Sequence, residues 1–450
     1  MKKIICMLLA CMMLLGLCAC GGNQAATATT APAAPEGLQV GFGRTNITPS
    51  YSVALQGGDY TKRMSQGVMD NLYATCIAIK SGEEIVLLYT IDVKLMTGSF
   101  VEPMKKAIST KTGIPENNIF LSATHTHSGP AVRYSWDGSS RYLAEFNDNV
   151  IGAAELAIKD LSAAEMYAGS TMTEGLVYVR HYVLLDGTIG GPNFGNENAP
   201  RQSHVRDADA ELQLVKFARE DKKDILMMSL GAHCTMNGQQ TDLMLSADYP
   251  APAREYIEGN DSDMLVAFFQ GASGDQVPTS SVDPNSAGRT GYRDHGKKLA
   301  QYAIDALPTL KAVEGEGIGF ANQKMTYATN KKDLDKTEGF NGRFEQKWIG
   351  IRKNLPATRD MVLRAVTVGN LGFVFAPYEM FGEQGKYIKD NSPLDLTFIA
   401  TCGEGDNSYL ASSTGGFAYN SYEAQVCYYA EGVAEQAAKD FVDILKLIRK

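Results

Sequence analysis

The chain has 450 residues, of which 44% are hydrophobic and 21% are charged, and its formal net charge is −9. This composition predicts a globular protein with a sizeable core and excludes an intrinsically disordered chain. No run or stripe of Lys and Arg stands out against the net negative charge, so we expect no nucleic-acid partner.

The first twenty residues have the pattern of a bacterial lipoprotein signal peptide. Lys2 and Lys3 precede an apolar stretch, residues 4–17, which is shorter than the roughly 20 residues that a membrane-spanning helix needs. A small residue followed by Cys20 comes soon after this stretch, as at the site where such a signal is cleaved and the cysteine is lipidated. We therefore expect residues 1–20 to be the signal and a lipid on Cys20 to anchor the protein to the bacterial cell membrane, outside the cytoplasm. The alternative is an ordinary secretory signal that is cleaved nearby.

Residues 21–37 are rich in Ala, Thr and Pro, and we expect them to be a flexible tether. Residues 38–450 contain no second low-complexity segment and no internal repeat, so we expect a single catalytic domain there. Four cysteines remain in this domain, scattered and without a CxxC pair, and they do not predict a disulfide framework. They are Cys76, Cys234, Cys402 and Cys427.

Several apolar runs predict buried strands, and polar residues follow the end of each run. The runs are residues 85–91, 119–121, 225–230, 264–269, 371–376 and 396–400. Helical spacing of apolar residues is found in residues 101–111, 147–161, 293–307 and 429–448. Nearly continuous apolar runs are typical of strands that are covered on both faces. We therefore expect a mixed α/β (α+β) fold, with central, largely buried sheets flanked by helices and a site at the carboxyl ends of the strands, along one edge of an open sheet.

Two histidines follow one of these runs. His125 and His127 lie in the segment Ser122–Pro130, and in an extended backbone residues i and i+2 point to the same side. Two imidazoles presented together suit a metal ligand and a catalytic partner. The alternative interpretation is a pair of exposed loop histidines.

A set of motifs in the same order along the chain resembles the N-terminal catalytic domain of the neutral/alkaline (non-lysosomal) ceramidases, which are zinc-dependent amidohydrolases. The segment HTHSGP, residues 125–130, is the most specific of them. The motifs lie at residues 40–49, 122–130, 232–250, 270–278, 376–379 and 407–423. The resemblance implies an enzyme that uses one Zn²⁺ ion to hydrolyse an N-acyl amide bond, such as that of ceramide, into sphingosine and a fatty acid.

The resemblance also implies which residues form the site. The zinc ligands would be His125, His233, Glu379 and Tyr409. Imidazole nitrogens and hard oxygens are donors that zinc accepts, and a catalytic site keeps room for water. Tyr419 is an alternative to Tyr409, because the spacing to the last motif is longer than the family pattern.

The remaining roles follow from the same resemblance. His127 would move a proton or stabilise the oxygen of the tetrahedral intermediate, Arg180 would lie in the substrate pocket, and Tyr422 would donate a hydrogen bond near the carbonyl. Asp248 and Asp275 would order loops or orient the ligands. His295, in a helical run, is expected at the surface.

Two other functions stay open. The resemblance leads us to expect a serine directly after Gln270, where this chain has Gly271. A zinc hydrolase of the same scaffold that acts on another amide or on an ester is therefore the first alternative. A non-enzymatic lipoprotein that binds a ligand at the cell surface is the second. A serine hydrolase is disfavoured because the chain has no G-x-S-x-G motif.

Overall fold

The computed structural model describes residues 37–57, 63–132, 139–196, 198–237, 243–286, 291–331, 354–405 and 408–450. The expected signal peptide, Cys20 and all but the last residue of the expected tether lie outside the described residues. Contacts group Glu36–Lys450 into one compact unit. Among the residues described, no helix combines the length and the apolar character that crossing a membrane requires.

A nine-stranded sheet forms the first of two central layers. Its order is β17-β15-β14-β9-β1-β5-β6-β7, with β19 beside β9. All neighbours are antiparallel except the pairs β6/β7 and β15/β17, which are parallel. The strands are β1 (Leu38–Asn46), β5 (Tyr73–Ser81), β6 (Glu84–Ile91), β7 (Ile119–Ala123), β9 (Ser162–Met172), β14 (Glu211–Arg219), β15 (Asp224–Leu230), β17 (Met264–Gln270) and β19 (Lys311–Ala312).

A four-stranded sheet, in the order β20-β21-β22-β24, forms the second central layer. Its strands are β20 (Ile318–Ala328), β21 (Thr358–Val368), β22 (Leu371–Phe375) and β24 (Leu396–Ala400). Only the pair β22/β24 is parallel. The two sheets pack face to face through a shared core, in which the Phe269 ring lies 5.5 Å from that of Phe398 and 6.5 Å from that of Phe375.

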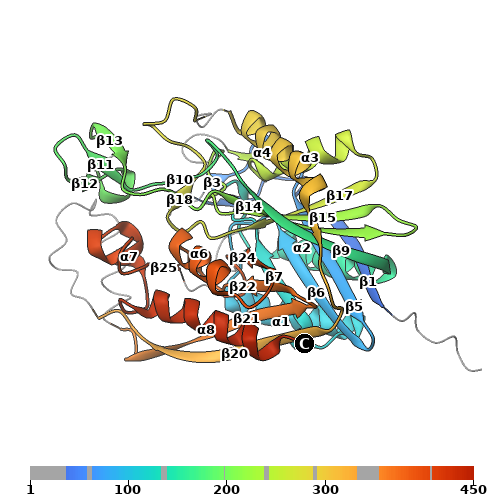
Figure 1. The fold of residues 1–450 in the computed structure, drawn as a ribbon. Coiled ribbons are helices and arrows are strands. Elements are labelled where there is room, and N and C mark those ends of the chain that lie inside the picture. The colour runs from blue at the N-terminus through green and yellow to red at the C-terminus, as the bar shows by residue number, and fades with distance from the viewer. Residues whose placement is uncertain are drawn as a thin grey trace, which may run out of the picture. The chain divides into compact units, whose positions relative to one another are not determined.

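Helices cover the two outer faces, so the layers run helix, sheet, sheet, helix. In β14, Leu212 and Leu214 point to helices while Val215 and Phe217 point to the other sheet, as alternating side chains in a strand do. Helices α3 and α4 lie on one side of the sheets and α6 and α8 on the other (Figure 1). The helices are α1 (Gly98–Thr112), α2 (Ser139–Lys159), α3 (Pro250–Asn260), α4 (Tyr292–Ala306), α6 (Gly382–Asn391), α7 (Tyr422–Val426) and α8 (Val433–Ile448).

Short strands build the loops around the ends of the long ones. They are β2 (Ala54–Gln56), β3 (Arg63–Met64), β4 (Gly67–Val68), β8 (Gly129–Pro130), β10 (Tyr178–Val179), β11 (Tyr182–Leu184), β12 (Ile189–Gly190), β13 (Arg201–His204), β16 (Met244–Leu245), β18 (Gln276–Val277), β23 (Glu379–Met380) and β25 (Tyr409–Leu410).

The mixed α/β fold expected from the sequence is confirmed, with one correction. A site along the edge of one open sheet was expected, but the parallel strands form three separate pairs in two stacked sheets. These pairs are β6/β7, β15/β17 and β22/β24. Each of the six apolar runs identified in the sequence is one of these six strands.

Candidate metal centre and active site

The carboxyl ends of the three parallel pairs meet through main-chain hydrogen bonds. The amide of Ala123, at the end of β7, donates to the carbonyl oxygen of Cys402 over 3.3 Å, and Thr401 donates to Gln270, at the end of β17, over 2.8 Å. The loops that follow β7, β17 and β24 therefore leave the two sheets at the same place. This junction brings together the histidines that follow β7 and β15 and the glutamate that follows β22.

His125 lies in a tight turn just after β7. Its φ of 62° is in the left-handed region, which is rare for a residue with a side chain. Its amide donates to the carbonyl of Val93 over 3.1 Å, and its Nδ1 lies 2.8 Å from the carbonyl oxygen of Lys94. A carbonyl can only accept, so Nδ1 carries a proton and Nε2 is the nitrogen that can bind a metal. The backbone is thus not the extended one that the HxH spacing suggested.

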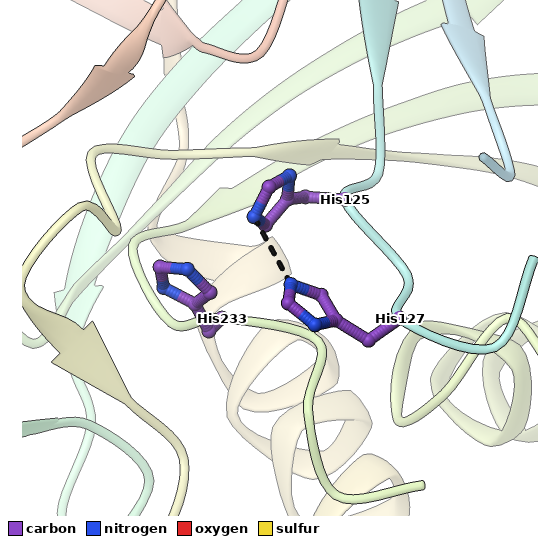
Figure 2. Close-up of side chains that lie close together, drawn as sticks. All are labelled: His125, His127 and His233. Carbon is purple, nitrogen blue, oxygen red and sulfur yellow. Dashed lines mark hydrogen bonds between the residues drawn. The ribbon is translucent and has the colours of Figure 1, made fainter. Parts of the chain in front are cut away.

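The three imidazoles of His125, His127 and His233 nevertheless converge, as Figure 2 shows. Each can offer one nitrogen such that all three lie within 4.8 Å of one another, and all three side chains are buried. The Nε2 atoms of His125 and His127 are 3.3 Å apart. These three histidines form a group that could hold a metal ion.

His233 follows β15 and is oriented by main-chain oxygens. Its Nδ1 lies 2.6 Å from the carbonyl oxygen of Ser273 and 3.1 Å from that of Gln276, so Nε2 carries the lone pair. Burial lowers the pKa of His233 to about 4, and the charge of Arg180 acts in the same direction. An imidazole that stays neutral is the form that binds a metal.

Glu379, in β23, places its carboxylate against the histidines. Its Oε2 is 3.3 Å from Nε2 of His125 and 3.1 Å from Nε2 of His233. Burial alone would raise the pKa of Glu379, but the two histidines, His125 foremost, hold it well below its ordinary value. Burial alone would lower the pKa of His125, but Cys402 and Glu379 raise it to about 10, so without a metal the ionised carboxylate faces a protonated His125. Once a metal displaces the proton from Nε2 of His125, the carboxylate and the imidazole nitrogens form a donor set that suits Zn²⁺.

Tyr409 lies next to this group and Tyr419 does not. Strand β25 pairs with β23 so that Tyr409 is opposite Glu379, and the Tyr409 ring is 6.4 Å from that of His233. The Tyr419 ring instead lies 6.5 Å from that of His181. Tyr422, the first residue of α7, packs its ring 5.7 Å from that of Tyr409. The geometry favours Tyr409 over Tyr419 as the tyrosine of the site.

Arg180 follows β10 and borders the group from the side of Tyr409. Its guanidinium carbon lies 5.2 Å from the centre of the Tyr409 ring, and its Nη2 donates to the carbonyl of Gly274 over 2.7 Å. Its Nε donates to Glu423 over 2.7 Å. The sequence assigned no role to Glu423, because nothing in a single sequence pairs two residues 243 positions apart.

Asp248 is a loop-ordering residue. It has a φ of 62°, and its buried carboxylate accepts the amides of Asn237 over 2.6 Å and Tyr249 over 2.8 Å. The hydroxyl of Tyr249 in turn donates to the carbonyl of Ala232, beside His233, over 2.6 Å. Asp248 thus supports the His233 loop through Tyr249.

Asp275 joins three segments around the site. Its carboxylate accepts the amide of Gly382 over 2.8 Å and pairs with Arg206, and its carbonyl accepts the amide of Arg180 over 2.9 Å. Gly382 lies shortly after Glu379. Asp275 therefore fixes the loops of Arg180 and Glu379 relative to each other.

One expectation at a single residue is corrected. His295 was expected at the surface, but only 1% of it is exposed, because it lies on the face of α4 that packs against Tyr249. Gly271 stands where the resemblance places a serine. A Cβ there would lie 2.8 Å from the carbonyl carbon of Leu230 and 2.9 Å from the amide nitrogen of Gly231. This backbone has no room for a side chain at position 271, so the expected serine has no counterpart here.

The chain matches a sequence model of a known family. The family is described as "Neutral/alkaline non-lysosomal ceramidase, N-terminal", and the match covers residues 38–337. A neutral ceramidase from Oryza sativa subsp. japonica is 22% identical over 227 residues, which are 49% of this chain and 28% of that protein. The aligned part of this chain thus spans less than a third of the rice protein.

Solved structures share the fold over nearly the whole chain. A neutral ceramidase from Pseudomonas aeruginosa superposes with a TM-score of 0.71 at 16% identity, covering 93% of this chain and 76% of the other. A structure described as a ceramidase complexed with C2 gives a TM-score of 0.69 at 16% identity, covering 92% and 75%.

Proposed function

Since this chain belongs to the neutral/alkaline non-lysosomal ceramidase family, we propose that it is a zinc-dependent amidohydrolase that cleaves the N-acyl amide bond of ceramide or a ceramide-like lipid, giving a sphingoid amine and a fatty acid. The observation that carries this proposal is the buried group of three histidines with the carboxylate of Glu379 within 3.3 Å of two of them. Burying three imidazoles and one carboxylate away from water costs free energy unless these groups bind a ligand or pair with one another.

The donor set fits a catalytic zinc ion. His125, His233 and Glu379 would hold the ion, with Tyr409 as a fourth ligand, because their nitrogen and oxygen atoms are the donors that zinc takes. When bound, zinc would supply the Lewis acidity that activates water and polarises the amide carbonyl. The tautomers imposed by the carbonyls of Lys94 and Ser273 present the correct nitrogens for this role.

The residues around the ion would bind the substrate and move the proton. Burial lowers the pKa of His127 well below its usual value, with a further contribution from Lys94, so a neutral imidazole faces the site. It would accept a proton from water and deliver it to the leaving amine nitrogen. Arg180 and Tyr422, on the Tyr409 side of the site, would donate hydrogen bonds to the substrate's polar atoms.

The test uses residues 21–450, which lack the lipid-anchor cysteine, and the His125→Ala variant of the same segment. We expect one equivalent of zinc per chain in the wild type, release of fatty acid from ceramides, and loss of both in the variant. Metal content is measured by mass spectrometry of the purified protein, and fatty acid by mass spectrometry of the reaction. His204→Gln is the matched control, since His204 forms hydrogen bonds with Val179 and Ser280 and not with the three histidines of the site. This variant should keep both the bound zinc and the release of fatty acid.

Two outcomes would redirect the proposal. Bound zinc with turnover of other amides or esters, but not of ceramides, would support the same-scaffold hydrolase with a different substrate. A chain that binds no metal and cleaves none of these compounds would support a ligand-binding lipoprotein. Ceramide hydrolysis that survives the His125→Ala change would contradict the proposed site.

We also propose that the protein is held on the outside of the bacterial cell membrane by a lipid on Cys20. The support is the signal pattern of residues 1–20 and the Ala/Thr/Pro-rich segment that follows. Metabolic labelling of full-length protein with an alkyne fatty acid should mark the wild type and not a Cys20→Ser variant. Labelling of neither form, with release of both into the medium, would argue for an ordinary secretory signal, and labelling of both would place the lipid on another residue.

A further inference from the structure

Glu423 sits at the centre of a group of hydrogen-bond donors beside the candidate site. The side chain is fully buried in α7. One oxygen lies 2.7 Å from Nε and 2.6 Å from Nη2 of Arg180, and it also accepts from the side chain of Asn193. The other oxygen is 3.1 Å from Nε2 of His181. A carboxylate with so many donors is held in one position and holds its partners in turn.

The same contacts fix the guanidinium of Arg180. Its main-chain amide donates to Asp275 over 2.9 Å, its Nη2 donates to Gly274 over 2.7 Å, and its Nε faces Glu423. The group is therefore anchored on both sides while it lies over the ring of Tyr409. An arginine held in this way is preorganised as a hydrogen-bond donor at low entropic cost.

The charge of Arg180 is compensated by this pairing. A substrate group that reaches Arg180 meets an ion pair without net charge, and Glu379 adds a second carboxylate close enough to affect Arg180. Burial alone would raise the pKa of Glu423, but Arg180 and His181 keep it below its usual range, so the compensating charge persists at neutral pH. Lys94, a further cation near the site, acts instead on His127.

We propose that Glu423 determines headgroup specificity: by neutralising Arg180 while holding it in place, it makes the pocket select N-acyl amides with an uncharged, hydroxylated headgroup over those with a carboxylate headgroup. The inference rests on the proposed amidohydrolase function and names the substrate class for it. An uncompensated arginine in the same place would favour a carboxylate, with which a guanidinium forms a paired, bidentate contact.

The experiment compares two substrates that differ in one group. N-Lauroylethanolamine ends in a hydroxyl and N-lauroylglycine in a carboxylate; the acyl chain is the same, and the headgroups have the same carbon chain and differ by one oxygen atom. We expect the wild type to have the higher kcat/KM for the ethanolamide. In Glu423→Gln, which keeps the shape but removes the charge, the ratio of the two kcat/KM values should shift toward the glycine conjugate by about tenfold or more, as one unit charge a few ångströms away predicts.

Two further variants keep the test valid even if Glu423→Gln does not fold. Arg180→Gln leaves Glu423 with the donors of His181 and Asn193, and the ratio should shift in the opposite direction, against the glycine conjugate. Glu258→Gln is the matched control: it weakens a bidentate pair with Arg44, over 2.9 and 3.1 Å, that bonds no residue of the site. Its ratio should equal that of the wild type.

A binding measurement separates failure of this inference from failure of the proposed function. Calorimetry with metal-free protein gives the affinity for each lauroyl amide without turnover. If the wild type hydrolyses neither amide but Glu423→Gln binds N-lauroylglycine about tenfold more tightly than the wild type does, the specificity inference stands and the amidohydrolase proposal fails. If hydrolysis occurs and both ratios stay at the wild-type value in Glu423→Gln and Arg180→Gln, the inference is overturned and the proposed function remains.

Discussion

The carboxylate of Glu379 lies between two imidazoles and is the single anionic donor in direct contact with them among the described residues. Glu379→Gln keeps the shape but removes the charge and one strong acceptor. We expect zinc affinity to fall on the order of 100-fold or more, the scale seen when groups that support a metal site are lost. Competition with a fluorescent zinc chelator measures the change.

A change at Glu383, four residues along the chain, provides the comparison. Glu383 pairs with Arg206 over 3.1 Å and accepts the hydroxyl of Ser412, and it bonds no histidine of the cluster. Glu383→Gln should retain wild-type zinc affinity within about threefold, since its charge does not face the ion. Equal losses in the two variants would indicate a general effect of charge on metal uptake and not ligation by Glu379.

Gly57 is the residue whose lack of a side chain shapes the site most directly. It has a φ of 152°, and a Cβ there would lie 2.2 Å from the carbonyl oxygen and 2.7 Å from the Cα of His127. Gly57→Ala must therefore displace the His127 main chain. Because a misplacement of about 1 Å costs on the order of 100-fold in rate, we expect kcat/KM to fall by that factor while zinc stays bound.

Gly98, at the start of α1, serves as the reference for Gly57. A Cβ at Gly98 meets no atom within 4 Å, and alanine favours a helix. Gly98→Ala should leave kcat/KM and zinc content unchanged. Unchanged activity in Gly57→Ala would mean either that the loop yields without cost or that His127 has no role in the reaction.

At the scale of elements, the sequence is most informative about the strands that carry the site. The six apolar runs are the members of the three parallel pairs, and such strands are buried on both faces, so their apolar runs are continuous. Antiparallel β9 is partly exposed, and its sequence mixes polar and apolar residues, so it was not predicted to be a strand. Short α6 and α7 also went unpredicted, since they contain few apolar residues in helical register.

The site itself could be predicted only in part. His125 and His127 were expected side by side from strand geometry, and their rings are 4.9 Å apart, although a left-handed turn and not an extended backbone brings them there. The closeness of Glu379 to them depends on how two sheets stack, which no local pattern encodes. The ligand roles of His125, His233, Glu379 and Tyr409 rest on the family resemblance and stay predictions.

Helix α4 contains a histidine whose burial makes stability depend on pH. Burial lowers the pKa of His295 to about 3, and neither ring nitrogen has a hydrogen-bond partner in the described part of the chain. The unfolded chain takes up a proton on this histidine as pH falls below the ordinary pKa of 6.5, whereas the folded protein does not. The free energy of unfolding is therefore highest above pH 6.5 and decreases as pH falls below that value. Between pH 6.5 and 5 the loss amounts to about 2 kcal/mol.

His295→Leu should remove this acid sensitivity. We expect its free energy of unfolding to be within about 1 kcal/mol of the wild type at pH 7.5 and about 2 kcal/mol higher than the wild type at pH 5. Urea denaturation of metal-free protein at both pH values measures the difference without a contribution from metal binding, and the histidines of the site, present in both proteins, cancel from the comparison. A constant difference between the variants at the two pH values would show that His295 does not titrate in this range.

At the scale of the whole molecule, one buried carboxylate joins the two sheets and a helix. Glu404 follows β24, and its oxygens lie 2.8 Å from Lys105 of α1 and 2.8 Å from Arg364 of β21. It also accepts the amide of Leu121 in β7 over 3.1 Å. The contacts connect both layers just behind the loop that leads to Tyr409, so Glu404 couples the packing of the sheets to the geometry of the site.

Glu404→Ala would leave two cationic groups buried without their common partner. Breaking a buried ion pair by removing one member costs about 3–5 kcal/mol, so we expect a loss of that size in the free energy of unfolding, measured by urea denaturation, together with weaker zinc retention. Glu155→Ala is the control, because the Glu155 pair with Lys111 spans 3.5 Å and is about half exposed, and exposed pairs contribute about 0–1 kcal/mol. If both variants lost less than 1 kcal/mol, the sheets would be held together by their apolar faces alone, and Glu404 would be a consequence of the packing and not a cause of it.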